Sequence, residues 1–178
     1  MAEPLTTAEL KAQLRKTTTD EDTLIASYGV AAREWVEEYT GHILNQREIE
    51  DNFGEWGDYL TLRYQPITVD DPTPTLTVEY TDDEGDFIEY EERVVRDFKY
   101  PWTVHAPYGM TFPSLGGPAT IKVTYTAGYA SAGAVPEIFK QAIRVLVTAM
   151  YDTRGHMTED AKECARFILR SKRGAVMA

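Results

Sequence analysis

The spacing of hydrophobic residues changes twice along this chain, and this change restricts the possible folds more than any other feature. In residues 5–41 and 136–173 apolar side chains recur three or four positions apart, as in amphipathic helices. Between about residues 43 and 126 several segments alternate apolar and polar side chains, as in half-buried strands. We therefore predict an α+β fold, with a helical bundle built from both ends of the chain and a β-rich insertion between them.

Capping residues mark where the predicted helices begin and end. Thr6 and Glu9 form a capping-box pattern for a helix from Thr7 to about residue 16, and residues 17–22 supply a cap for a second helix that ends at Gly41. Pro136 occupies the first position of a strongly apolar helix, which we expect to be the most buried element. After Gly155 a last short helix is predicted to run from about Thr158 to near residue 173.

Period-two alternation predicts strands at residues 59–64, 75–80 and 120–125. The polar residues 81–86 separate the second of these from residues 87–90, and Gly85 can adopt a positive φ. We therefore predict a β-hairpin over residues 75–90. Most of the prolines lie in this middle region, which favours short strands and long loops.

Length and composition indicate a single domain over residues 1–178 with a full hydrophobic core. The formal net charge of −11 argues against nucleic acid as the main ligand. Cys164 is the only cysteine, which excludes an intrachain disulfide and fits a reducing cytoplasm; we expect it to face the helical core. No signal peptide or membrane span is expected, because no run of about 18 apolar residues occurs.

Three stretches, taken in order, resemble the head-tail connector (adaptor) proteins of tailed phages, which also occur in gene transfer agents. They are residues 31–41 (AAREWVEEYTG), residues 123–129 (VTYTAGY), and Val135 and Pro136 leading to residues 141–143 (QAI). The similarity spans nearly the whole chain and is weakest between Phe53 and Pro118.

The resemblance implies a structural virion protein that is not an enzyme. Such a connector binds the portal ring after DNA packaging, forms its own ring, usually of twelve copies, and presents a platform for the next connector, head-completion or tail protein. Double-stranded DNA would pass through the ring. The implied location is the neck of the virion, after assembly in the cytoplasm of the host bacterium.

Two charged segments are candidate sites within this role. Acidic residues are absent after Glu163, so an apolar and basic surface for portal binding is predicted at Arg166, Phe167, Ile168, Leu169, Arg170, Lys172 and Arg173. The alternative is that these cations only complement a helix dipole. An acidic loop that lines a DNA channel is predicted at Asp82, Asp83, Glu84 and Asp86, with a solvated hairpin face as the alternative.

Other chemical patterns are weak. His42, His105 and His156 do not form a zinc-ligand pattern, residues 82–86 do not match a calcium loop, and the serines and Cys164 lack a nucleophile motif, so neither a cofactor nor a metal is expected. A hydrolase with paired carboxylates remains an alternative, as does a monomeric cytosolic binding module.

Aromatic residues are concentrated in the middle of the chain, where they fit either a protein interface or a small β core. They are Trp56, Tyr59, Tyr100, Trp102, Tyr108 and Phe112.

Overall fold

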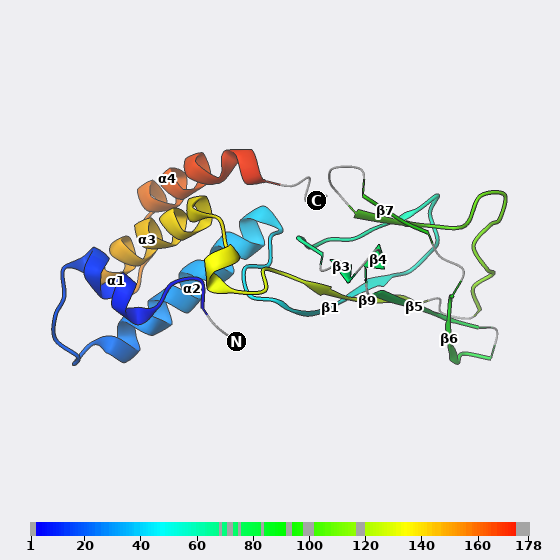
Figure 1. Cartoon of the computed structure of the whole chain (residues 1–178), viewed down its shortest axis with the longest axis horizontal. Helices are drawn as coiled ribbons and strands as arrows, with labels where there is room; N and C mark the ends of the chain where they lie inside the picture. Colours follow the sequence, from blue (N-terminus) through cyan, green and yellow to red (C-terminus); the bar gives the residue numbers. More distant parts are fainter. Residues whose placement is uncertain are drawn as a thin grey trace. The chain divides into compact units, whose positions relative to one another are not determined.

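The computed structural model describes residues 3–67, 69–70, 73–74, 76–82, 84–91, 94–97, 102–116 and 120–173. The chain divides into two compact units: a helical unit up to Gln46 and again from Tyr129, and a β unit over Arg47–Gly128. The predicted α+β fold, with helices from both chain ends and a β-rich insertion, is confirmed (Figure 1).

The helical unit contains α1 (Thr7–Leu14), α2 (Asp22–Thr40), α3 (Glu137–Asp152) and α4 (Glu159–Leu169), with short 3-10 turns at Ala132–Ala134 and Arg170–Lys172. These helices pack around one apolar core (Figure 1). The side chains of α3 supply much of that core, because Phe139, Ala142, Ile143, Leu146 and Val147 are all at most 2% exposed. The apolar stripe seen in the sequence is therefore the face by which α3 packs on its neighbours.

Most helix boundaries follow the predicted capping residues. Thr6 and Glu9 form the reciprocal capping box, Gly41 ends α2 with a φ of 70°, and Thr158 accepts a hydrogen bond from the Ala161 N–H at the start of α4. The N-cap residue of α2 is Glu21, within the predicted residues 17–22, but no side chain accepts a capping hydrogen bond there. Pro136 is the N-cap of α3 and not its first residue.

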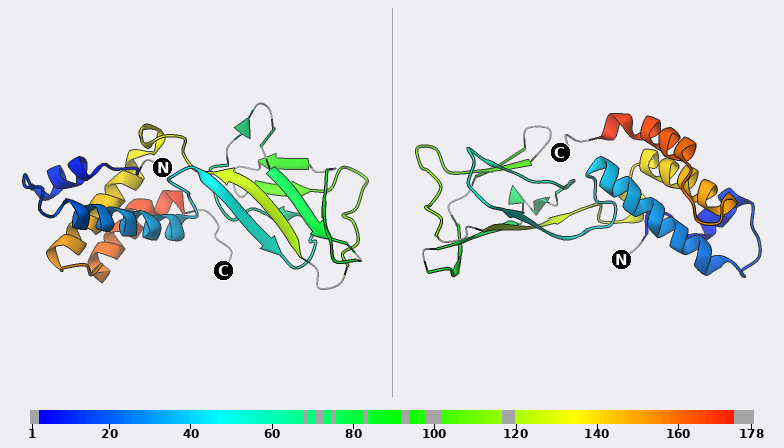
Figure 2. Two further views of the ribbon diagram at one scale, coloured as in Figure 1. Left: turned by 90° about the horizontal axis from the view of Figure 1, so that it is seen from below. Right: turned by 180° about the vertical axis from the view of Figure 1, so that it is seen from behind.

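The β unit is built on a four-stranded antiparallel sheet in the order β1-β9-β5-β6, shown in Figure 2. These strands are β1 (Arg47–Phe53), β5 (Leu76–Thr81), β6 (Phe87–Glu89) and β9 (Ile121–Ala127). A second sheet has the order β2-β8-β7, and β3 pairs with β4. Their bounds are β2 (Leu60–Thr61), β3 (Val69–Asp70), β4 (Thr73–Pro74), β7 (Val94–Asp97) and β8 (Trp102–His105).

The predicted strands agree with the structure to different extents. The hairpin is confirmed, since β5 pairs with β6 from Thr81 opposite Phe87, and Gly85 has a φ of 89°. β9 is also confirmed and alternates strictly between buried and half-buried residues. The strand predicted at residues 59–64 is reduced to the two residues of β2. β1, β3, β4, β7 and β8 have no counterpart among the predicted strands.

A polar network holds the segment after β2 against the main sheet. The Tyr125 hydroxyl donates to Asp51 Oδ2 at 2.7 Å and accepts from the Tyr64 N–H at 3.1 Å. Asp51 Oδ2 also accepts from the Arg63 N–H at 2.9 Å. Burial, and then the hydrogen bond to Asp51, raises the pKa of Tyr125, so the phenol keeps the proton that it donates.

A second polar network lies where α2 ends. Glu37 is 4% exposed; its Oε2 accepts from Arg33 Nη1 at 2.8 Å and its Oε1 from the Leu44 N–H at 2.7 Å. Arg33 Nε also donates to Glu3 Oε2 at 3.0 Å. The carboxylate of Glu37 thus satisfies both a partly buried cation and a buried backbone donor.

Candidate functional site

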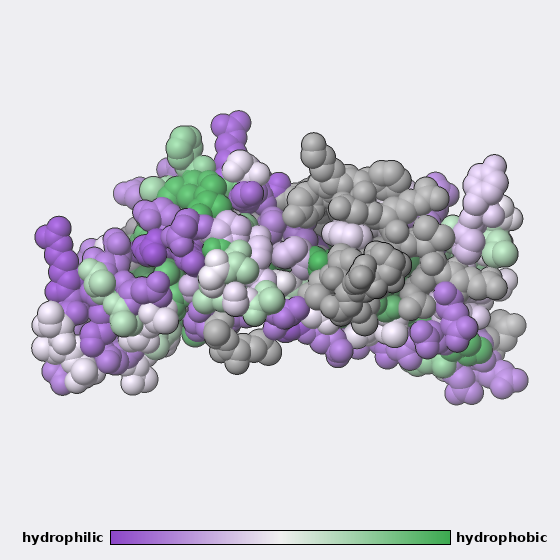
Figure 3. Space-filling model, in the orientation of Figure 1, coloured by the Kyte–Doolittle hydropathy of each residue, from purple (hydrophilic) through white to green (hydrophobic). Residues whose placement is uncertain are grey.

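The predicted portal-binding segment forms the last turns of α4 and the 3-10 turn after it. Ala161, Ala165 and Leu169 are buried at a spacing of four residues and turn one face of α4 onto the helical core. Side chains on the other face, including Cys164 and Phe167, are exposed. Our expectation that Cys164 faces the core is therefore wrong, because the buried stripe passes through Ala165 instead. In Figure 3, hydrophobic surface over α4 lies among hydrophilic side chains.

The apolar residues of this segment have different roles. Leu169 is fully buried and Ile168 packs against the helical core, so both belong to the interior. Phe167 is 78% exposed, although burying a phenylalanine ring would be favourable by about 2 kcal/mol. An exposed ring of this size on a rigid helix is a typical anchor for a protein partner.

The cations also divide into two groups. Trp35 and Tyr39 of α2 stack on each other with ring centroids 5.4 Å apart. The Arg166 guanidinium lies 5.9 Å from the Trp35 ring, and that of Arg173 lies 5.4 Å from the Tyr39 ring. These two cations therefore attach the end of the chain to α2. Arg170 and Lys172 are exposed and are the cations best placed to meet a partner.

His42 fixes the 3-10 turn from the inner side. Its ring is 4% exposed and lies 4.9 Å from the ring of Phe139. Burial, and next the charge of Lys172, lowers the pKa of His42 to about 4, while a hydrogen bond to the Lys172 backbone opposes the shift. The imidazole is thus neutral at pH 7, and it acts as a structural contact to the C-terminal segment. No motif around His42 in the sequence indicates this contact.

This pKa predicts a loss of stability in acid. Between pH 6.5 and about pH 4 the unfolded chain protonates His42 and the folded chain does not, so folding loses about 3 kcal/mol from this group over that window. Urea unfolding at a series of pH values should show a smaller acid loss for His42→Gln than for the wild type. His156→Gln is the control, because His156 is exposed. Equal acid losses in His42→Gln and the wild type would contradict the assignment.

The predicted acidic loop is the turn of the β5–β6 hairpin. Asp82 Oδ1 accepts from the N–H groups of Glu84 and Asp86, both at 2.9 Å, so Asp82 builds the turn. Glu84 and Asp86 are exposed, and Asp83 lies outside the described residues. The adjacent Phe87 and Ile88 are 50% and 43% exposed, so this surface is apolar as well as acidic.

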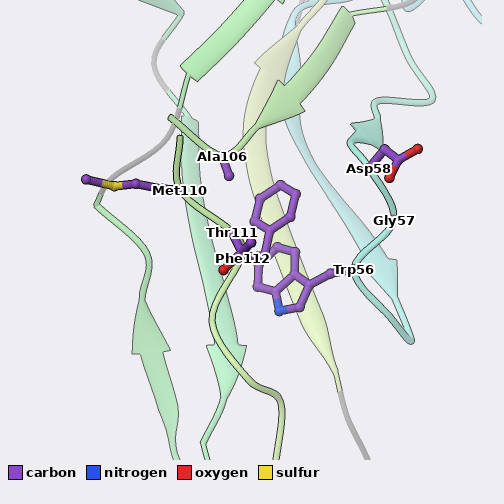
Figure 4. A pocket seen from close by; sticks show the side chains of 7 residues that line it. All are labelled: Trp56, Gly57, Asp58, Ala106, Met110, Thr111 and Phe112. Atoms are coloured by element: carbon purple, nitrogen blue, oxygen red, sulfur yellow. The ribbon is translucent and has the colours of Figure 1, made fainter. Parts of the chain in front are cut away.

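Aromatic residues of the middle region form a cluster beside a pocket. Trp56 and Phe112 stack with centroids 4.4 Å apart and planes 3° apart, and the Tyr90 ring lies 5.9 Å from each of them. The pocket has a volume of about 380 Å³ and is lined by Trp56, Gly57, Asp58, Ala106, Met110, Thr111 and Phe112 (Figure 4). Tyr59 and Tyr108 are instead exposed, and Tyr100 lies outside the described residues. Trp56 and Phe112 are thus half-buried within the β unit, whereas Tyr59 and Tyr108 face solvent.

Among the described residues, no group of three or more His, Cys, Asp or Glu side chains could hold a metal ion. None of the described helices is long and apolar enough to cross a membrane.

The chain is similar to solved structures over nearly its full length. A chain in the neck of an empty gene transfer agent particle, computed with C6 symmetry, has a TM-score of 0.78 and 24% identity, with 98% of this chain and 93% of that chain covered. A chain in the virion of a native gene transfer agent particle has a TM-score of 0.75 and 24% identity, with 96% and 90% covered. A chain in the neck of the native particle, computed with C12 symmetry, has a TM-score of 0.72 and 22% identity, with 98% and 92% covered.

No protein-family model matches the sequence, and no curated protein does. The structural likeness agrees with the resemblance carried by residues 31–41, 123–129 and 135–143. The chain therefore has the fold of a chain found in the neck of gene transfer agent particles.

Proposed function

We propose that this chain is a structural virion protein, a head-tail connector that binds the portal ring after DNA packaging and is not an enzyme. Its copies form a ring, of twelve in our proposal, that joins the head to the next connector, head-completion or tail protein. The observation that carries the proposal is the match of 98% of the chain to a neck structure with a TM-score of 0.78. The C6 and C12 symmetries of the similar necks support a ring.

In this proposal the two units form one connector domain located in the neck of the virion and assembled in the host cytoplasm. Phe167, Arg170 and Lys172 supply the portal contact, because they are the exposed members of the predicted set that are not stacked on α2. Arg166 and Arg173 position the segment against α2, and Ile168 and Leu169 hold it on the helical core.

Cryo-electron microscopy of the protein mixed with its cognate portal tests this function directly. We expect an added ring on the portal into which this chain fits, with the C-terminal segment against the portal. Intact portals without added density would contradict the proposal. That outcome would favour one of the two alternative functions, a monomeric binding module or a hydrolase with paired carboxylates.

The exposed acids of the hairpin turn are proposed to line the DNA channel. A negatively charged wall offers the phosphates of the passing DNA no cations to bind. The substitutions Glu84→Gln and Asp86→Asn, which remove these two charges, should therefore slow DNA ejection from assembled particles. Asp82 is left unchanged because it builds the turn. The control neutralises two exposed acids of the helical unit, Glu38→Gln and Asp152→Asn. Ejection at the wild-type rate would show that the hairpin acids do not face the channel.

A further inference from the structure

The loop between β8 and β9 has an unusual composition for this chain. Residues 106–120 contain no Asp, Glu, Lys or Arg, although the chain carries a formal net charge of −11. Copies of one acidic chain repel one another, and this repulsion is weakest where the facing surfaces carry no charge. The loop thus brings no charge of its own to a contact with a second copy, and Asp58 is the one charged residue among those that line the pocket described below.

A tight turn in this loop presents a tyrosine to solvent. The Met110 N–H donates to the Pro107 carbonyl at 3.0 Å, and Gly109 has a φ of 80°, a conformation that glycine adopts without strain. Within this turn, the Tyr108 side chain is 100% exposed and Met110 is 56% exposed. The turn fixes the backbone that carries Tyr108, so burying its ring against a partner orders only the side chain.

The same loop also forms one wall of the aromatic pocket. Phe112 stacks on Trp56, and both contact the Tyr90 ring, so this wall is already in place without a partner. Figure 4 shows the stacked pair in the middle of the pocket, with Met110 and Asp58 on opposite sides of it. The loop therefore carries an exposed aromatic side chain and, a few residues further on, one wall of a pocket of about 380 Å³ that holds the stacked Trp56 and Phe112 rings.

We propose that this loop is the contact between neighbouring copies in the ring, with Tyr108 of one copy entering the Trp56–Phe112 pocket of the next. The inference rests on the ring of the proposed function. Each copy inserts its Tyr108 turn into one neighbour, and its own pocket receives the turn of the other neighbour. The contact is therefore heterologous, and a full set of such contacts forms a closed ring. A tyrosine that enters a preformed aromatic pocket is a frequent anchor of protein interfaces. Nucleic acid fits this surface poorly, because the loop offers no cation to a phosphate.

Cysteine crosslinking on the portal-bound ring tests the contact. In a Cys164→Ser background, which removes the exposed native thiol, Pro107→Cys, which keeps the Tyr108 side chain, is combined with Asp58→Cys at the pocket and treated with a short bismaleimide. We expect a ladder of multimers on a denaturing gel for the paired variant, and monomers for each single variant. Rings visible by cryo-electron microscopy without a ladder would overturn the contact. Dimers from Pro107→Cys alone would also overturn it, because they would indicate a face-to-face arrangement.

A second measurement leaves Cys164 unchanged and needs no crosslinker. Tyr108→Ala should reduce the yield of complete rings on the portal at least about tenfold, as expected for loss of an interface anchor. Tyr59→Ala is the matched control, because Tyr59 is 50% exposed in the same unit and its ring contacts His105 of its own chain. Equal ring yields for Tyr108→Ala and the wild type would refute the inference while leaving the proposed function intact. If the wild type forms no ring, the proposed function fails, and this contact fails with it.

Discussion

The Phe167→Asp variant is expected to bind the cognate portal at least about 30-fold more weakly than the wild type. Phe167 is 78% exposed on the outer face of α4 and is the largest apolar side chain that the C-terminal segment offers to a partner. Truncation of an interface anchor commonly costs about 2 kcal/mol or more, and a carboxylate would in addition be desolvated there. Co-sedimentation of the purified protein with portal rings measures the change.

The control for this variant is Leu24→Asp. Leu24 is also an exposed apolar residue of the helical unit, 39% exposed on α2, but it lies outside the proposed contact. Its variant should bind the portal like the wild type. Equal binding by Phe167→Asp and the wild type would refute the portal contact. Deleting the residues after Ile168 would be a poorer test, because it removes Leu169, which is fully buried in the helical core.

The Glu37→Ala variant is expected to lower the free energy of unfolding by about 3 kcal/mol. Removing this carboxylate leaves the buried Leu44 N–H without its acceptor and takes from Arg33 its most buried counter-ion. Glu3 and Glu34 also contact Arg33, but both are more exposed than Glu37. Urea denaturation followed by circular dichroism measures the loss.

Glu34→Ala provides a matched control for Glu37→Ala. Glu34 contacts the same arginine, at 3.4 Å, but its side chain is 64% exposed. An exposed ion pair contributes at most about 1 kcal/mol, so this variant should unfold close to the wild type. Similar losses for the two variants would mean that burial of Glu37 does not set its contribution.

The sequence predicted the helical unit well because its local signals agree with its packing. The caps at Thr6, Gly41 and Thr158 and the apolar stripe of α3 each specify the same helices that the core requires. The start of α2 is the exception: its N-cap, Glu21, lies within the predicted residues, but no side chain accepts a capping hydrogen bond there.

β1 could not be predicted because its inward positions are not consistently apolar. Along Arg47–Phe53 the half-buried positions include Arg47 and Asp51 as well as Ile49 and Phe53. Asp51 is tolerated there because it accepts hydrogen bonds from Tyr125 and from the Arg63 backbone, far from it in sequence. A strand stabilised by such distant polar contacts shows no period of two in its hydrophobic residues.

The candidate site was predicted as a segment, but the roles of its side chains were not. Charge alone groups Arg166 and Arg173 with Arg170 and Lys172. Only the packed structure shows that the first two stack on Trp35 and Tyr39, because these contacts join residues more than 100 positions apart. Likewise, burial of His42 under the last turn left no motif in the sequence.

The chain enters and leaves the β unit through neighbouring backbone segments. The Gln46 N–H donates to the Tyr129 carbonyl, and the next residues pair as Arg47 with Ala127. Because the ends of the insertion are tied together, loops inside it can gain or lose residues without shifting the helices that flank it. Selection can thus reshape the β unit while the helical unit keeps its own contacts, so one scaffold can carry insertions of different size and shape.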